Sequence, residues 1–516
     1  MKVIFKIYTL LSIFLIFSCS DQLDETPIDA IDADYIYSSE AGLEAGVTGL
    51  YNKMRELNYD EGTNSIFSSV FFRIATDLGI GRVNLDQCYN PNRYNANWPM
   101  QNWGRLYYII DRSNAIIAYA PDIEMDQTRK DILLAQARAI RAEVYMQLYT
   151  TYNNILFKPE PTTIENIDEI DYTPADPADI WALVDSDLDF AISKLDWVVE
   201  PGRYGQGVAR HLRGISALWQ EDWQEAVNQF DAVVESGVYH LVEVDEVFTG
   251  DKNHAESLYT YQTSRALGGG NELAGGGPSA LASMFNCRIY ELSSGEMIPE
   301  VQYGGLAFGW AFPNDYCQSL YDRENDKRYT TYYYEQNYIV NNPNSPNFGQ
   351  PLPESSIEDN FRRYHFSLKK FHDPDKPASS DQSYQNFVHY RFAETLLFGA
   401  EAHWHLSGSN TDATALEYIN MVRRRAFGDN NHDYTTIDLD SYLEEHAREM
   451  ALEASRWYVL KRLGVLVERV NLYFQGGSNS GNVHGVQMED YMVNYPIPQS
   501  QLDLMKGFPQ NDGYTQ

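Results

Sequence analysis

Two stretches of the chain place apolar residues at every third or fourth position. In residues 133–148 the apolar positions step by four, three, four and four, and in residues 181–195 by three, four, four and three. An α-helix turns once every 3.6 residues, so this spacing puts the apolar side chains on one face of a helix. These positions are Leu133, Ala137, Ile140, Val144 and Leu148, followed by Trp181, Val184, Leu188, Ile192 and Leu195.

Further helical segments follow one another with short breaks. Residues 179–196, 203–219 and 222–236 form one series, and residues 389–406, 411–427 and 442–463 form a second. Closely spaced helices predict stacked helical hairpins, similar to tetratricopeptide (TPR-like) units but without a strict repeat length. We therefore predict a mainly α fold with helical blocks at about 40–240 and 387–465.

The segment between the two blocks, about 241–386, has a different composition. It is rich in Gly, Pro, Asn and Tyr, as in LGGGNELAGGGPSA (267–280) and RYTTYYYEQNYIV (328–340). Such composition predicts long loops with short helices and a few short strands. Long loops in a compact protein usually carry function, so this Gly- and Tyr-rich segment is expected to bind the ligand.

Residues 89–104 read YNPNRYNANWPMQNWG, which places aromatic rings and asparagines together. Pro91 and Pro99 disfavour regular helix or central strand, so the part before residue 103 is predicted to be a loop. Flat apolar rings beside amide groups suit the binding of a sugar. The alternative is that the rings only pack the loop onto the helices.

Charge limits the partners. Asp and Glu total 73 against 39 Lys and Arg, which gives a net charge of −34. A chain this acidic is repelled by phosphate backbones, so we expect no nucleic-acid partner. Tyr (38 residues) outnumbers Phe (23), and nine Trp are present, so many side chains combine an apolar face with a polar tip.

The N-terminus has the pattern of an export signal. Lys2 and Lys6 precede an apolar run, residues 7–18, that is too short to span a bilayer. Residues 16–19 (IFSC) resemble a bacterial lipobox, in which the peptidase cuts before the cysteine that carries the lipid. We predict a lipoprotein signal peptide at 1–18 and lipidation of Cys19; an ordinary secretory signal is the alternative.

No catalytic or metal-binding motif was found. The chain lacks the zinc-protease HExxH and the esterase GxSxG, and its glycine cluster at 268–277 lacks the Lys-Ser/Thr of a phosphate loop. His403 and His405 lie two residues apart on a predicted helix, so they face different directions. We expect no metal, no cofactor and no enzymatic activity. Cys287 and Cys317 could form a disulfide in an oxidising compartment.

Several segments together resemble the SusD/RagB family of outer-membrane nutrient-binding lipoproteins of the Bacteroidetes. They include an N-terminal pair and four C-terminal signatures, and with them the resemblance covers nearly the whole mature chain, 19–516, as a single SusD-like domain. The segments are WGRLYYIIDRSNAII (103–117), ARAIRAEVYMQLYTTYNNILF (137–157), VHYRFAETLLFGAEAHWHLSG (388–408), ALEYINMVRRRAFG (415–428), EEHAREMALEASRWYVLKRLG (444–464) and NYPIPQSQLDLMKGFPQNDGY (494–514).

The resemblance implies a function. Family members bind an oligosaccharide or polysaccharide outside the cell and deliver it to a SusC-like TonB-dependent transporter for glycan uptake. The protein would then be lipid-anchored in the outer membrane, facing the extracellular side. Two alternatives remain: a capture protein of the same family for a non-glycan nutrient such as peptide, and a helical scaffold or adhesin.

The signatures also have a structural interpretation. Arg391, Glu394 and Glu401 share one predicted helix, and Glu445, Glu449, Glu453 and Arg456 share another, so we expect charge networks that join helices. Residues 494–499 (NYPIPQ) are expected to pack extended against the helices. The chain departs from the family pattern at four positions, which are Ala454 for Gly, Val459 for Asp, His446 for Arg and Asn154 for Gly.

The resemblance also indicates where a glycan would bind. Trp103 falls in a structural helix and is assigned to the core, whereas the family builds its site from the loop before that helix and from the middle segment. The predicted glycan-binding residues are Arg82, Tyr89, Tyr94, Asn97 and Trp98, with a second contribution from Tyr303, Trp310 and Phe312.

Overall fold

The structure is a computed structural model that describes residues 39–58, 70–82, 85, 88–97, 102–164, 166–167, 170–264, 279–477, 483–485 and 487–514. The predicted signal peptide at 1–18, the predicted lipidation site Cys19 and the predicted ligand residue Trp98 lie outside these ranges. Most of the glycine-rich stretch at 267–280 also lies outside them.

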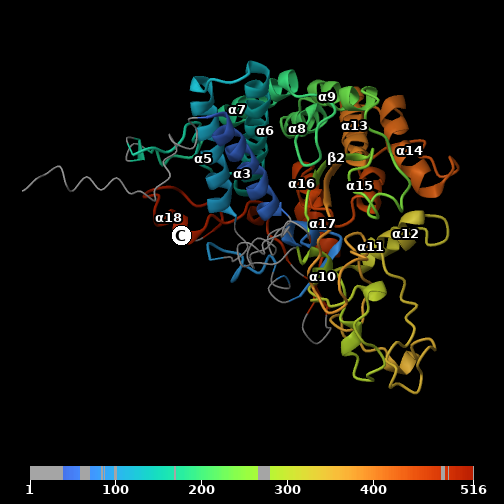
Figure 1. The fold of residues 1–516 in the computed structure, drawn as a ribbon. Helices are drawn as coiled ribbons and strands as arrows, with labels where there is room; N and C mark the ends of the chain where they lie inside the picture. Colours follow the sequence, from blue (N-terminus) through green and yellow to red (C-terminus); the bar gives the residue numbers. More distant parts are fainter. Residues whose placement is uncertain are drawn as a thin grey trace, which may run out of the picture.

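Helices of the first block lie side by side along one edge of the molecule (Figure 1). Consecutive helices pack on each other from α5 to α6, α7, α8 and α9, and α13 from the second block packs against α9. Their bounds are α3 (Glu40–Asn58), α5 (Trp103–Tyr119), α6 (Gln127–Tyr152), α7 (Pro177–Lys194), α8 (Gln206–Trp219) and α9 (Trp223–Glu235), with the 3-10 turn η3 (Ala120–Asp122) between α5 and α6.

Polar caps start several of these helices close to the predicted positions. The side chain of Asp176 accepts a hydrogen bond from the Ala178 amide at the start of α7, and Asp222 accepts one from the Glu225 amide at the start of α9. Such caps satisfy amides that have no partner within the helix. The predicted stacking of helical hairpins is confirmed.

The second block differs from the prediction in two places. Residues 389–406 were predicted to be helical, but β4 (Phe387–Arg391) precedes α13 (Phe392–Ser407). Residues 442–463 were predicted to form one helix, but the chain forms α15 (Leu439–Glu449) and α16 (Ser455–Arg462). Leu452 (φ 62°) and Ala454 (φ 89°) between them adopt left-handed backbone, which an α-helix cannot include. The remaining helices are α14 (Ala413–Phe427), α17 (Leu466–Tyr473) and α18 (Gln499–Leu502), with the 3-10 turn η10 (Asp490–Val493).

The middle segment is loop-rich, as predicted, and projects from the helices (Figure 1). It carries a small core of its own around Ile80, Cys287 and Phe312. Its regular elements are all short: β2 (Ser257–Tyr261), α10 (Leu281–Met284), η7 (Ile289–Glu291), η8 (Val301–Tyr303), β3 (Ala311–Pro313), α11 (Asp315–Ser319), α12 (Lys327–Tyr332) and η9 (Glu354–Ser356).

A small sheet joins the N-terminal half to this middle segment. Its strand order is β3–β1–β5–β6, with β1 at Gly79–Gly81, β5 at Gln475–Gly477 and β6 at Val483–Gly485. Strand β1 runs antiparallel to β3, and Ile80 lies opposite Phe312. Just past this pairing, the Arg82 amide donates to the Trp310 carbonyl at 2.7 Å. Residues 82 and 310, both predicted to serve the ligand site, are therefore neighbours.

A buried charge network joins the second block to the middle segment, as predicted. The Glu449 carboxylate contacts Arg391 and Arg425 at 2.5 Å each and Arg328 at 3.2 Å, and all four side chains are almost completely buried. Burial alone would raise the pKa of Glu449, but these arginines hold it well below its usual value. The predicted charge network is confirmed for Arg391 and Glu449, and Arg328 and Arg425 join it although the sequence did not predict them.

The C-terminal segment packs against the first block, also as predicted. The Tyr495 amide donates to the Thr151 carbonyl at 2.8 Å, and Asn511 donates to the carbonyls of Tyr152 and Tyr495. Tyr495 is 1% exposed and its ring meets Tyr152 edge-on at 5.7 Å. The chain end therefore helps to cover the C-terminal end of α6.

The disulfide between Cys287 and Cys317 does not form. Both thiols are free and buried, with Cys287 Sγ 3.9 Å from the Tyr338 hydroxyl and Cys317 Sγ 3.3 Å from the Tyr333 hydroxyl. Each cysteine fills its own apolar site. Across the described residues, no helix has both the length and the apolar character needed to cross a membrane.

Candidate functional site

The rings of Tyr89 and Tyr94 lie in the core. Tyr89 is 1% exposed, donates to the Ala75 carbonyl at 2.6 Å and accepts from the Trp457 indole at 3.0 Å. Tyr94 is fully buried and packs edge-on against Tyr495 at 5.5 Å. Trp457 and Tyr495 come from the C-terminal part of the sequence. The two rings pack the loop onto the core, and the loop offers neither ring to a ligand.

The two predicted polar residues of this loop region differ in exposure. Asn97 is exposed, and its backbone amide donates to the Asn95 side chain at 2.9 Å. Arg82 is 2% exposed and its guanidinium donates to the Gly309 carbonyl, which fixes the neighbouring 309–310 backbone. Arg82 therefore holds the backbone of the predicted site in place and does not offer its charge to a ligand.

In the middle segment, Trp310 is half-buried and packs against the main core. Its ring stacks on the Phe308 ring with centroids 5.0 Å apart and an interplanar angle of 27°. We call Phe308 and Trp310 the aromatic pair. Its position beside β1 and β3 is set by the backbone bonds of Trp310 to Met284 and Arg82.

The other two predicted residues of the middle segment pack locally. Phe312 is fully buried and its ring lies 4.9 Å from the His365 ring. Tyr303 is half-buried, its ring lies 5.2 Å from that of Tyr338, and its hydroxyl accepts from the Ile339 amide at 3.1 Å. Phe312 therefore belongs to the small core, and the Tyr303 hydroxyl stabilises the loop that contains Ile339.

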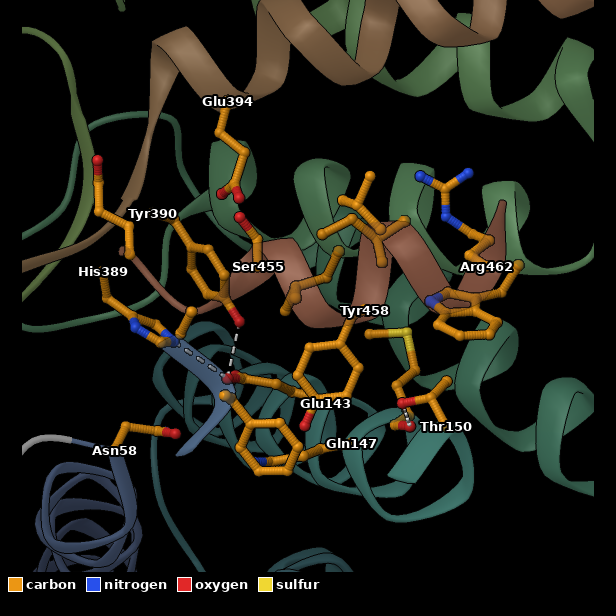
Figure 2. A pocket seen from close by; sticks show the side chains of 18 of the residues that line it. Asn58, Glu143, Gln147, Thr150, His389, Tyr390, Glu394, Ser455, Tyr458 and Arg462 are labelled. Atoms are coloured by element: carbon orange, nitrogen blue, oxygen red, sulfur yellow. Dashed lines mark hydrogen bonds and ion pairs between the residues drawn. The ribbon is translucent and has the colours of Figure 1, made fainter. Parts of the chain in front are cut away.

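A separate cavity of about 170 Å³ opens between the helices (Figure 2). We call it the interhelical cavity. Its walls come from the end of α3 and from α6, α8, β4, α13 and α16, so both helical blocks contribute. Its polar lining includes Glu143, His389, Tyr390, Glu394, Ser455 and Tyr458, and its apolar lining includes Phe72, Met146, Leu212 and Phe398.

Glu143 is the central polar group of the cavity wall. It projects from α6, is 6% exposed, and accepts hydrogen bonds from Tyr390 at 2.8 Å and from Tyr204. His389 Nε2 lies 3.7 Å from the same carboxylate (Figure 2). Burial and the Glu143 charge raise the pKa of Tyr390 well above its usual value, so this hydroxyl stays protonated and donates.

Glu394 and Ser455 lie on another part of the wall (Figure 2). Glu394, in the first turn of α13, is 3% exposed and lies 3.4 Å from His211 Nε2. Ser455 is the first residue of α16, and its buried hydroxyl has no hydrogen-bond partner. A buried hydroxyl without a partner is rare in folded proteins and marks a place where a ligand or water can bind.

Sequence reasoning did not find the interhelical cavity. Glu143, His389, Glu394 and Ser455 all lie in segments that were recognised, but only as structural family signatures. The cavity residues are brought together from positions between residues 57 and 462 by helix packing.

Comparison with known proteins shows which proteins this chain is similar to. Residues 313–514 match the model of the SusD family. SusD-like protein P25 of Formosa agariphila is 24% identical, with 97% of this chain and 98% of the relative aligned. The starch-binding protein SusD of Bacteroides thetaiotaomicron is 33% identical over a shorter region, 24% of this chain and 21% of the relative.

Solved structures agree. A laminarin-binding SusD-like protein superposes with a TM-score of 0.70 at 22% identity, covering 93% of this chain and 100% of its own. Residues 313–514 therefore belong to the SusD family, and the whole chain is similar to SusD-like proteins. Surface glycan-binding protein A of Bacteroides thetaiotaomicron, solved with laminarihexaose, gives a TM-score of 0.70 at 18% identity, with 92% of this chain and 99% of that chain covered. The mainly α, SusD-like fold predicted from the sequence is confirmed.

Proposed function

We propose that this SusD/RagB protein is a non-catalytic, cell-surface lipoprotein that binds an oligosaccharide or polysaccharide and delivers it to a SusC-like TonB-dependent transporter. The observation that carries the proposal is the aromatic pair, a half-buried stacked platform beside the loop at 82–97. Support comes from solved structures of the same fold, which are a laminarin-binding SusD-like protein and a surface glycan-binding protein in complex with laminarihexaose.

The aromatic pair has the properties that a sugar ring requires. An indole offers a flat, polarisable face to the C–H groups of a pyranose, and stacking on Phe308 limits the motions of Trp310 before any ligand arrives. The exposed carboxamide of Asn97 provides both a donor and an acceptor for hydroxyl groups. Trp98, the next residue, is proposed to supply a second ring.

The proposed location follows from the N-terminal sequence. A cleavable signal ending before Cys19 and an acidic SDQLDE after it fit a lipoprotein sorted to the outer face of the outer membrane. One acyl-bearing cysteine would then anchor the chain. Peptide capture by the same fold is the second candidate function, because aromatic and amide groups also bind peptides.

Titration calorimetry with the mature chain tests the ligand site, after a glycan array has identified a ligand. Trp310→Ala and Trp98→Ala should each weaken glycan binding by about thirtyfold, equivalent to ~2 kcal/mol, while the melting temperature changes little. Trp103→Ala is the control: Trp103 is 2% exposed, so its loss should reduce folding stability by ~3–5 kcal/mol. Wild-type glycan affinity in both Trp310→Ala and Trp98→Ala would refute this site.

Membrane attachment and partnership need separate experiments. Cys19→Ala should abolish labelling by a palmitate analogue and release a folded protein from the membrane fraction. A pull-down from solubilised outer membrane should recover a large barrel protein with the wild-type chain. Labelling of the Cys19→Ala protein would contradict the anchor, and a pull-down that contains this chain alone would contradict the transporter partnership.

A further inference from the structure

We propose that the interhelical cavity is a second binding site, separate from the aromatic pair, for a small organic amine with a compact apolar body. The ligand would place a protonated amino group between Glu143 and Glu394 and an apolar group of about one ring against the helices. This inference does not depend on the glycan proposal, because it rests on different residues.

The first argument is an imbalance of charge in the cavity wall. Other buried glutamates nearby are neutralised by strong bases: Glu401 pairs with Arg462, and Glu453 pairs with Arg391 and Lys370. Within the described part of the chain, Glu143 and Glu394 have only histidines as ion-pair partners, at 3.7 Å and 3.4 Å. Arg73 and Arg462 also line the cavity, and Arg462 is paired with Glu401. Two buried carboxylates with no lysine or arginine within 4 Å favour the entry of a cation beside them.

The second argument is unused hydrogen-bonding capacity. A carboxylate can accept about four hydrogen bonds, and Glu143 accepts one on each oxygen, from Tyr390 and Tyr204. The Ser455 hydroxyl has no partner at all. An ammonium group carries three donors, so it can satisfy acceptors on this wall that the protein leaves open.

The third argument is size and lining. The cavity of about 170 Å³ is close to the ~150 Å³ of apolar protein cavities that accept a benzene ring. Phe72, Met146, Leu212 and Phe398 supply apolar surface to the same cavity. Gln147, on α6, and Tyr458, on α16, are only half-buried, so the cavity communicates with solvent. A molecule that combines a ring with an amine matches both the apolar lining and the glutamates of the cavity.

The test compares two molecules of nearly equal shape. Phenethylamine carries the ammonium group, and 2-phenylethanol replaces it with a neutral hydroxyl. By titration calorimetry near neutral pH, the full mature chain should bind the amine at least about tenfold more tightly than the alcohol, the preference that one charge-assisted hydrogen bond typically gives. Equal binding of the two, or binding of neither, would overturn the proposal.

Two isosteric variants locate the binding. Glu143→Gln and Glu394→Gln should each reduce the preference for the amine about tenfold and leave affinity for the alcohol unchanged. Trp310→Ala is the matched control and should retain the preference for the amine, because its ring lies outside this cavity. If both glutamine variants bind phenethylamine as the wild type does, the amine binds elsewhere and the proposal fails. If a variant does not fold, the wild-type comparison still decides.

Discussion

Replacing the Glu449 carboxylate by an amide of the same shape should remove one of the main supports between the second helical block and the middle segment. In the Glu449→Gln variant, three arginines lose a carboxylate that now lies 2.5 Å from Arg391 and Arg425 and 3.2 Å from Arg328. The amide of glutamine also turns a donor towards guanidinium groups that have no acceptor to offer.

The expected cost follows from the contacts that remain. Arg391 keeps Glu256 and Glu453, Arg425 keeps Glu256, and Arg328 keeps Asp326 and Glu445, each within 3.0 Å. Breaking a buried charge pair typically costs ~3–5 kcal/mol. Since each arginine retains a carboxylate, we expect the lower end, a loss of about 3 kcal/mol in the free energy of unfolding.

Glu444→Gln provides the matched control on the same helix. Glu444 is 40% exposed and pairs with Arg448 at 2.8 Å at the surface. Exposed pairs contribute ~0.2–1 kcal/mol, because water competes for both charges. Urea unfolding of the three proteins, followed by circular dichroism, measures the difference. A Glu449→Gln variant no less stable than Glu444→Gln would refute the view that this network stabilises the fold.

The pH dependence supplies a second readout. The pKa of Glu449 is lowered well below the ordinary value of 4.5 in the folded chain, so its contribution to stability is fully present above that value and is lost as pH falls. The gap between wild type and Glu449→Gln should therefore narrow as pH falls below 4.5. A gap that stays constant would show that the cost of the substitution is not electrostatic.

Three further changes have defined outcomes. Ala454→Gly should raise stability by about 0.5–1 kcal/mol in urea unfolding because φ is 89°, whereas Ala182→Gly on the exposed face of α7 should lower it by about 1 kcal/mol; equal effects would contradict the strain. Burial lowers the pKa of Lys461 to about 7, so between about pH 7 and 10.5 the unfolded chain binds a proton that the folded chain does not. The free energy of unfolding of the wild type should therefore rise with pH in this range by up to ~1.4 kcal/mol per pH unit more than that of Lys461→Met. Parallel curves for the two proteins would refute this. Reducing agent should leave the melting temperature unchanged because Cys287 and Cys317 are free, and a fall would reveal a disulfide.

The helices could be predicted where the sequence carries both a stripe and a cap. The predicted range 179–196 lies within two residues of α7 at both ends, because Pro177 and Asp176 start the helix and apolar positions mark its buried face. The single helix predicted for 442–463 failed because the break at Leu452 and Ala454 uses left-handed residues that are neither Gly nor Asn. No local signal in the sequence distinguishes such a break from continued helix.

The ligand site was harder to predict than the fold, because exposure depends on distant partners. Tyr89 and Tyr94 have the sequence context of displayed rings, yet Trp457 and Tyr495 cover them. Trp310 is less buried than these two rings: it stacks on Phe308, two residues away, and packs against the edge of the core. Composition indicated that rings and amides gather in these loops, but only packing decides which ring faces outward.

The long-range contacts that bury Tyr89 and Tyr94 also set the order in which the protein can fold. The Tyr94 hydroxyl donates to the carbonyl of Met492, 398 positions later, and the Trp457 indole donates to the Tyr89 hydroxyl across 368 positions. Contacts between such distant parts of a chain form late, because closing the intervening loop costs entropy before any contact forms. The aromatic core around the N-terminal loop cannot close until the chain has been synthesised as far as Met492. A chain interrupted before Met492 should consequently remain a substrate for proteases.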